Sequence, residues 1–123
     1  MIFARLAAAT VLGLVTIGTA STAGAWGQRL DDFAKCITDN GATFYGTYWC
    51  PQCERQREAF GRSDRYLNYV ECAYRDSDET KRECKRAGIK SYPTWEFGDG
   101  SHVSGFQSLR RLADRTGCEL PEE

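Results

Sequence analysis

Residues 49–53 read Trp-Cys-Pro-Gln-Cys, and this stretch joins a predicted strand to a predicted helix. The strand covers 42–47, a run rich in Thr, Phe and Tyr. The helix covers 50–62, with Pro51 in its first turn, where the backbone N–H groups lack partners and a proline is tolerated. The two cysteines therefore lie one helical turn apart, with the first at the helix N-terminus.

The rest of the chain also alternates between helix and strand patterns. The remaining predicted elements are a helix over 28–39, a strand over 66–72, a highly charged helix over 76–87, a hairpin of 94–97 and 102–105, and a helix over 107–116. We expect Asp76 or Ser77 to cap the charged helix. The first and last helices should each bury one apolar face, formed by Leu30, Phe33, Ala34 and Ile37 in the first and by Leu109, Leu112 and Ala113 in the last. After the first helix the order is β-α-β-α-β-β-α, which favours a sheet with helices on its faces. This is the order of the thioredoxin-like core, so we predict an α/β fold. It would be a three-layer α/β/α sandwich with a central mixed four-stranded sheet and an extra N-terminal helix.

Cys50 and Cys53 are the predicted reactive pair. A thiolate at a helix N-terminus is stabilised by unpaired N–H groups and by the helix dipole, and the thiolate is the attacking species. We expect Cys50 to be the nucleophile, reachable from solvent, and Cys53 to be the buried thiol that resolves a mixed disulfide.

Two other interpretations of this pair are a zinc site and a purely structural bridge. Zinc normally needs a second pair of ligands, but the chain has no other Cys-x-x-Cys and His102 is its only histidine. A bridge across so small a loop constrains the unfolded chain little. We therefore expect no metal and favour redox chemistry.

The first 25 residues have the pattern of an export signal. A charged start is followed by an apolar run, 6–18, and by Ala23-Gly24-Ala25, so we expect cleavage after Ala25 and a single domain over 26–123. An uncleaved N-terminal anchor is the alternative. With 16 Lys and Arg against 17 Asp and Glu, the charges are balanced and predict no nucleic-acid binding.

All six cysteines follow the predicted signal, which favours disulfides in an oxidising compartment. We expect Cys72 to pair with Cys84, because the charged helix lacks aliphatic side chains that would hold it on the sheet. Cys36 and Cys118 pair by elimination. Otherwise each is free, or Cys36 bonds another molecule.

A series of short matches resembles one family. The matching segments are Phe33–Cys36, Tyr45-Gly46, Trp49–Cys53, Phe60-Gly61, Asn68–Cys72, Glu83–Lys85, Ala87–Ile89, Tyr92–Trp95 and Ser104–Leu109. Together they resemble the thioredoxin-like domain associated with bacterial and plant homologues of vitamin K epoxide reductase, over about Phe33 to Gly117.

The resemblance implies roles for several residues. Pro93 would be cis and would face the dithiol, and the backbone beside it, at Tyr92 and Thr94, would pair with a client peptide as an added strand. An ordinary trans turn proline is the alternative. Independently of the resemblance, the position of Tyr48 and Trp49 before the dithiol leaves two alternatives, an apolar rim for client side chains or partial burial against the sheet. The resemblance also implies the Cys72–Cys84 pair.

Two positions depart from the family pattern. Many members carry His where this chain has Gln52. The residues between the cysteines, Pro51 and Gln52, help to set thiolate stability. The resemblance therefore does not fix the reduction potential of this dithiol. Thioredoxins proper place a buried Asp six residues before the first cysteine. Here that residue is Phe44, which argues against a plain thioredoxin reductant.

We therefore predict a periplasmic or otherwise exported thiol–disulfide oxidoreductase, a monomer without a bound cofactor. The resemblance implies that it oxidises client proteins and is reoxidised by a quinone-linked membrane enzyme, which we expect to be a separate protein similar to vitamin K epoxide reductase. The alternatives are a periplasmic disulfide reductase or isomerase and a non-enzymatic metal-binding module.

Overall fold

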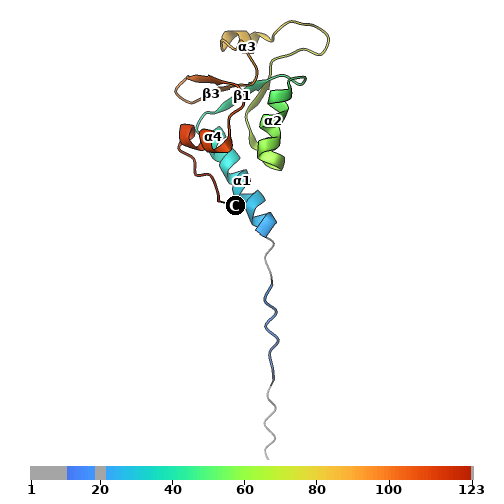
Figure 1. The fold of residues 1–123 in the computed structure, drawn as a ribbon, viewed down its shortest axis with the longest axis vertical. Helices are drawn as coiled ribbons and strands as arrows, with labels where there is room; N and C mark the ends of the chain where they lie inside the picture. Colours follow the sequence, from blue (N-terminus) through green and yellow to red (C-terminus); the bar gives the residue numbers. More distant parts are fainter. Residues whose placement is uncertain (1–10, 19–21, 123) are drawn as a thin grey trace, which may run out of the picture.

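The structure is a computed structural model, and it describes residues 11–18 and 22–122. Figure 1 shows a sheet with helices on both sides. The elements in chain order are α1 (Thr22–Asp39), β1 (Thr43–Gly46), α2 (Pro51–Phe60), the 3-10 helix η1 (Gly61–Tyr66), β2 (Tyr69–Glu71), α3 (Arg82–Arg86), β3 (Thr94–Glu96), β4 (His102–Ser104) and α4 (Leu109–Thr116).

The four strands form one mixed sheet in the order β2-β1-β3-β4. β1 runs parallel to β2 and antiparallel to β3, and β3 and β4 form the predicted hairpin. Phe44 is the central residue of the sheet, because it pairs with Tyr69 on one side and with Trp95 on the other. The predicted α/β class with a mixed four-stranded sheet is therefore confirmed.

Strand alternation sends neighbouring side chains to opposite faces of the sheet. Phe44 and Trp95 point to one face, where their rings stack with centroids 5.0 Å apart and join the core formed with α1, α2 and α4. Tyr45 points to the other face, toward a small cluster built on Cys72, Cys84 and Ile89 under α3. Figure 1 shows α3 alone across the sheet from the other helices, which completes the three layers.

The predicted inward faces of the first and last helices are correct. Leu30, Phe33 and Ile37 of α1 and Leu112 of α4 are buried in the main core. α1 begins earlier than the predicted residue 28, because Ala23 and Ala25 are strong helix formers and extend it back to Thr22.

The prediction of a helix over 76–87 is wrong for most of its length. Residues 74–79 are all exposed and irregular, and only Arg82–Arg86 is helical. Neither Asp76 nor Ser77 caps it; its first flanking residue is Lys81, without a side-chain cap. The segment has no apolar stripe to pack on the sheet, and short polar side chains bond nearby backbone instead, as the Ser77 hydroxyl does when it accepts the Glu79 N–H.

Two disulfides connect the elements. Cys36 of α1 is bonded to Cys118 beyond α4, and Cys72 after β2 is bonded to Cys84 of α3. These are the pairs named from the sequence. Cys50 and Cys53 are the free cysteines among the described residues.

The predicted export signal is described only in part. Residues 1–10, with its charged start, and 19–21 lie outside the described residues, as do the side chains of 22–25 around the predicted cleavage point. Residues 11–18 have no regular structure, and large apolar side chains there, such as Val11 and Leu14, are about nine-tenths exposed at 91% and 89%. Within the described ranges, no helix has both the length and the apolar character to cross a membrane.

Candidate active site

Cys50 is the residue that begins α2. It has extended backbone angles, φ −81° and ψ 116°, and Pro51 follows in the first turn. Its Sγ accepts the backbone N–H of Cys53 at 3.2 Å. The predicted placement of the first cysteine at a helix N-terminus is thus confirmed, and its sulfur occupies the place of a side-chain oxygen in an ordinary N-cap.

Cys53 lies beneath Cys50 and is completely buried, at 0% exposure. Burial raises the pKa of its thiol to about 12, and the hydrogen bond with Cys50 adds to that rise. The backbone N–H of Thr47 and the positive charge of Arg57 oppose it. Cys53 therefore stays protonated at neutral pH in the dithiol form unless a partner or reaction step changes its surroundings.

Cys50 is less accessible than expected, since the residue is only 6% exposed. The reason is geometric. Its Sγ turns back over the first turn of α2 to accept the Cys53 N–H rather than pointing into solvent. A difference between the two thiols remains, because Cys53 has no exposed surface at all.

A buried glutamine, which the sequence analysis did not single out, fixes α2 in place. Gln56 is 0% exposed, and its Oε1 accepts from Trp95 Nε1 at 3.0 Å and from the Gln107 N–H at 2.8 Å. Its Nε2 donates to the Gln107 carbonyl at 2.9 Å. The sequence did contain a signal for this role, because Gln56 is a polar residue three positions after Cys53 and therefore falls on the buried side of the predicted helix.

Pro93 is buried, and the Tyr92–Pro93 peptide bond is cis. The Pro93 carbonyl accepts the Gly105 N–H at 2.8 Å, and the Thr94 hydroxyl donates to the Ser91 carbonyl at 2.8 Å. Among the described residues, no backbone hydrogen bond outside the helices and strands involves Tyr92.

The aromatic residues before the dithiol form an exposed surface. Trp49 is 60% exposed and contacts Tyr92 edge to face, with ring centroids 6.2 Å apart. Tyr48 is 40% exposed, and the Arg75 guanidinium lies 4.3 Å from the centre of its ring. Of the two predicted alternatives for Tyr48 and Trp49, an exposed rim describes their side chains better than burial against the sheet.

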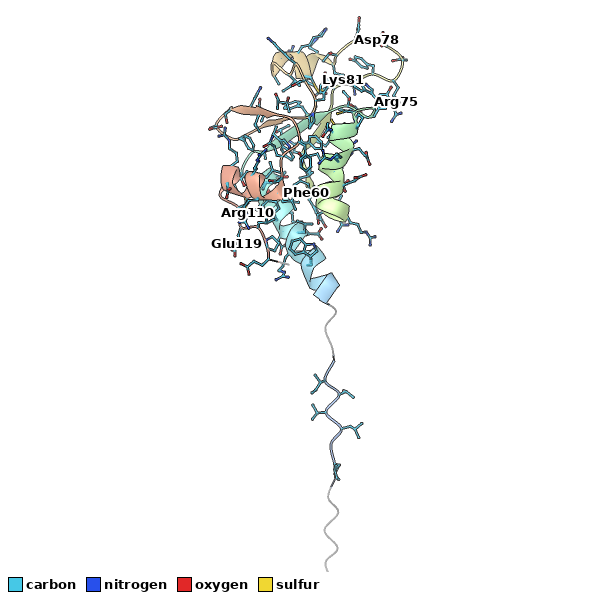
Figure 2. The ribbon with its side chains drawn as sticks, viewed as in Figure 1. Phe60, Arg75, Asp78, Lys81, Arg110 and Glu119 are labelled. Carbon is cyan, nitrogen blue, oxygen red and sulfur yellow. A yellow bond between two sulfur atoms is a disulfide. The ribbon has the colours of Figure 1, made fainter. Side chains whose placement is uncertain are left out.

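A groove of about 480 Å³ runs between these aromatic residues and the loop that follows β2. Tyr48, Trp49 and Tyr92 line one side, and residues 73–80 line the other. Figure 2 shows Arg75 and Asp78 of this loop at the end of the molecule opposite Glu119.

Gln52, the other residue between the cysteines, is exposed. Its Oε1 accepts a hydrogen bond from Arg55 at 3.1 Å. Over the part of the chain that the structure describes, no group of three or more His, Cys, Asp or Glu side chains is arranged to hold a metal ion.

Together these features suit thiol–disulfide exchange. The sulfur of Cys50, a residue that is 6% exposed, lies at a helix N-terminus, and the sulfur of the fully buried Cys53 lies one turn further along. The four remaining cysteines are already paired. Such an arrangement can form a mixed disulfide at the first sulfur and release it with the second.

Comparison with known proteins shows similarity to a plant oxidoreductase. Over 93 residues the chain is 39% identical to thiol-disulfide oxidoreductase LTO1 of Arabidopsis thaliana, a match that covers 72% of this chain. The same match covers only 24% of that relative's length. No protein-family model matches the chain. The chain thus contains a domain similar to one part of a larger thiol–disulfide oxidoreductase.

Proposed function

We propose that this chain is a thiol–disulfide oxidoreductase that works through Cys50 and Cys53. The observation that carries the proposal is the pair itself. Cys50 begins α2 and accepts the Cys53 N–H with its sulfur, and the two are the free cysteines of the described chain. The similarity to one part of a thiol-disulfide oxidoreductase supports it.

The reaction balances without a bound cofactor. A client thiolate attacks Cys50 Sγ of the Cys50–Cys53 disulfide, forming a client–Cys50 bond while the electron pair of the broken bond leaves on Cys53. The second client thiolate then attacks the client sulfur and displaces Cys50. Two electrons pass from the client to the protein, the client's two thiol protons are released, and two protons from solvent complete the Cys50–Cys53 dithiol.

The groove beside Trp49 and Tyr92 is the proposed client site. Its exposed aromatic side suits apolar client side chains, and Tyr92, next to the cis-proline, has backbone groups that a client strand would use. A client lying there would bring its sulfur toward Cys50, the residue after Trp49.

We propose further that the protein is exported and acts as an oxidant. Four of its six cysteines form disulfides, which suits an oxidising compartment. The apolar run 6–18, followed by Ala23-Gly24-Ala25, has the pattern of an export signal. A quinone-linked membrane enzyme similar to vitamin K epoxide reductase would take two electrons and two protons from the reduced dithiol.

The first experiment traps the intermediate. In the Cys53→Ser variant, the Cys50 thiolate attacks a client disulfide, forming a client–Cys50 bond while the other client sulfur leaves as a thiol. Because the buried sulfur that would break this bond is missing, clients remain bonded to Cys50 and appear as mixed disulfides on non-reducing gels of the exported fraction. The Cys50→Ser/Cys53→Ser double variant is the control and must lose these adducts. Adducts that persist in the double variant, or none in folded Cys53→Ser, would argue against the proposal.

The second experiment decides the direction. The reduction potential of the Cys50–Cys53 pair is measured by equilibration with glutathione while the other two disulfides remain intact. An oxidant should have a potential closer to about −120 mV than to the roughly −270 mV of a thioredoxin-like reductant. A value near the latter would favour the reductase alternative.

A further inference from the structure

We propose that Tyr69 and Arg57 stabilise the Cys53 thiolate as it forms, so that they replace the carboxylate that thioredoxins place under this sulfur. This inference rests on the proposed function and extends it. Tyr69 would act through its neutral hydroxyl, as a hydrogen-bond donor to sulfur. Arg57 would act through its positive charge.

Gly46 brings the sulfur and the tyrosine ring together. A Cβ added at Gly46 would lie 3.0 Å from Cys53 Sγ and 3.0 Å from Tyr69 Cε2, so these two atoms lie within 6.0 Å of each other. Glycine is needed here because a side chain on β1 would separate them. Phe44, two residues earlier on the same face of β1, offers no polar atom to the sulfur.

The Tyr69 hydroxyl is a donor without a partner. Its oxygen is buried and makes no hydrogen bond of ordinary geometry within the described residues. Buried polar groups are almost always paired, so an unpaired hydroxyl on a ring whose edge lies within 6.0 Å of a reactive sulfur calls for a functional explanation. Burial, reinforced by the negative charge of Glu71, raises the pKa of Tyr69 to about 12, although Arg57 opposes the rise, first as a hydrogen-bond donor toward the hydroxyl oxygen and then through its charge. The phenol thus keeps its proton for donation.

Arg57 lies one turn after Cys53 on the same side of α2. Its guanidinium carbon is 5.2 Å from the centre of the Tyr69 ring, and its Nη2 donates to Glu54 Oε2 at 3.0 Å. Its side chain is only 22% exposed. A positive charge in the surroundings of a buried sulfur favours the ionised form, and the Arg57 charge does lower the pKa of Cys53, as the smallest of the causes and against the larger effect of burial.

Tyr69 and Arg57 would act when a client thiolate attacks the Cys50–Cys53 disulfide. The bond between Cys50 and Cys53 breaks, its electron pair goes to Cys53 Sγ, and the new thiolate is buried. The Tyr69 O–H then donates to that sulfur while Arg57 supplies opposite charge. Tyr69 does not transfer its proton, and a proton from solvent later converts the thiolate to a thiol. In the reverse step the same groups favour the Cys53 thiolate that attacks a mixed disulfide.

The test measures that reverse step in the full chain. Reduced protein reacts at Cys50 with a symmetrical disulfide of a coloured thiol, which forms the mixed disulfide and releases a first equivalent of that thiol. The release of the second equivalent, by attack of Cys53 on the mixed disulfide, is followed across a range of pH. We expect Tyr69→Phe to slow release about tenfold at pH 7, which corresponds to about 1.4 kcal/mol. Its pH profile should move to higher pH.

Matched variants separate this role from a structural one. Tyr45→Phe makes the same change one strand away on the opposite face of the sheet and should leave release unchanged. Arg57→Gln should slow release, and Arg57→Lys should restore most of the rate because it keeps the charge. Unchanged release in both Tyr69→Phe and Arg57→Gln would overturn the inference. Failure of wild-type Cys50 to react at all would instead contradict the proposed function.

Discussion

The two disulfides join regions of very different construction. Cys36–Cys118 links α1 to the segment after α4, two elements that already share the main core through Phe33, Ile37 and Leu112. Cys72–Cys84 links the residue after β2 to α3, where the buried apolar residues are the two cysteines and Ile89. The first disulfide adds to an existing core. The second disulfide takes the place of a core, because the buried apolar area under α3 is too small to hold residues 73–89 on the sheet by itself.

Removing Cys36–Cys118 should have the largest effect on global stability. This bond closes a loop with a sequence separation of 82 residues, and the chain-entropy treatment gives about 4.5 kcal/mol for such a loop. Denaturant unfolding of the Cys36→Ala/Cys118→Ala variant should show that loss. Hydrogen exchange should still find α1 and α4 folded together, since their packing remains. Local opening of these helices, with the rest of the domain still protected, would contradict this view.

Removing Cys72–Cys84 should cost less but act locally. Its separation of 12 residues corresponds to about 3 kcal/mol in the same treatment. In the Cys72→Ala/Cys84→Ala variant, amides of residues 73–89 should lose protection while those of α1 and α2 keep theirs, as hydrogen exchange with mass spectrometry can show. If 73–89 stays protected, the contrast between the two regions fails.

A third variant tests the interior that carries the dithiol. Gln56→Leu leaves Trp95 Nε1 and the Gln107 N–H without their shared acceptor. Unpaired buried donors of this kind cost about 1–3 kcal/mol, so we expect a loss of about 2 kcal/mol in the free energy of unfolding. Gln52→Leu, an exposed change on the same helix, is the matched control and should alter stability by less than about 0.5 kcal/mol. Equal effects of the two would argue against the network.

The smallest effect concerns helix capping, which also differs between the regions. The Ser108 hydroxyl accepts the Arg111 N–H at the start of α4, whereas Lys81 gives α3 no side-chain cap. Ser108→Ala should therefore cost about 1 kcal/mol, and Lys81→Ala almost nothing. Thermal unfolding of the two variants provides the comparison. A larger loss in Lys81→Ala would mean that α3 depends on its own helical structure rather than on its disulfide.

The same contrast explains what could be predicted from the sequence. α1, β1, α2, the β3–β4 hairpin and α4 follow apolar periodicity and turn residues, and the structure contains them all. The helix predicted over 76–87 fails because charge and a possible cap were its only support. Where apolar contacts are missing, helix propensity does not decide the conformation.

The candidate site was predictable in its covalent part and not in its polar surroundings. The spacing of Cys50 and Cys53 and the proline in the first turn placed the dithiol on α2. The sequence pattern assigned no role to Gln56 or Tyr69, because each has an ordinary position in its own helix or strand. Their meaning comes from contacts across the fold, 39 residues apart for Gln56 and Trp95.

The central claim is that Cys50 and Cys53 differ in reactivity because one begins α2 and the other is buried beneath it. In the most direct measurement, the protein is reduced only at Cys50 and Cys53 and is then treated at pH 7 with a limiting amount of an alkylating reagent. Mass spectrometry then identifies which of the two thiols is modified. We expect modification at Cys50 and almost none at Cys53, whose pKa burial raises to about 12. Equal modification of both thiols, or of neither in the folded protein, would contradict the account.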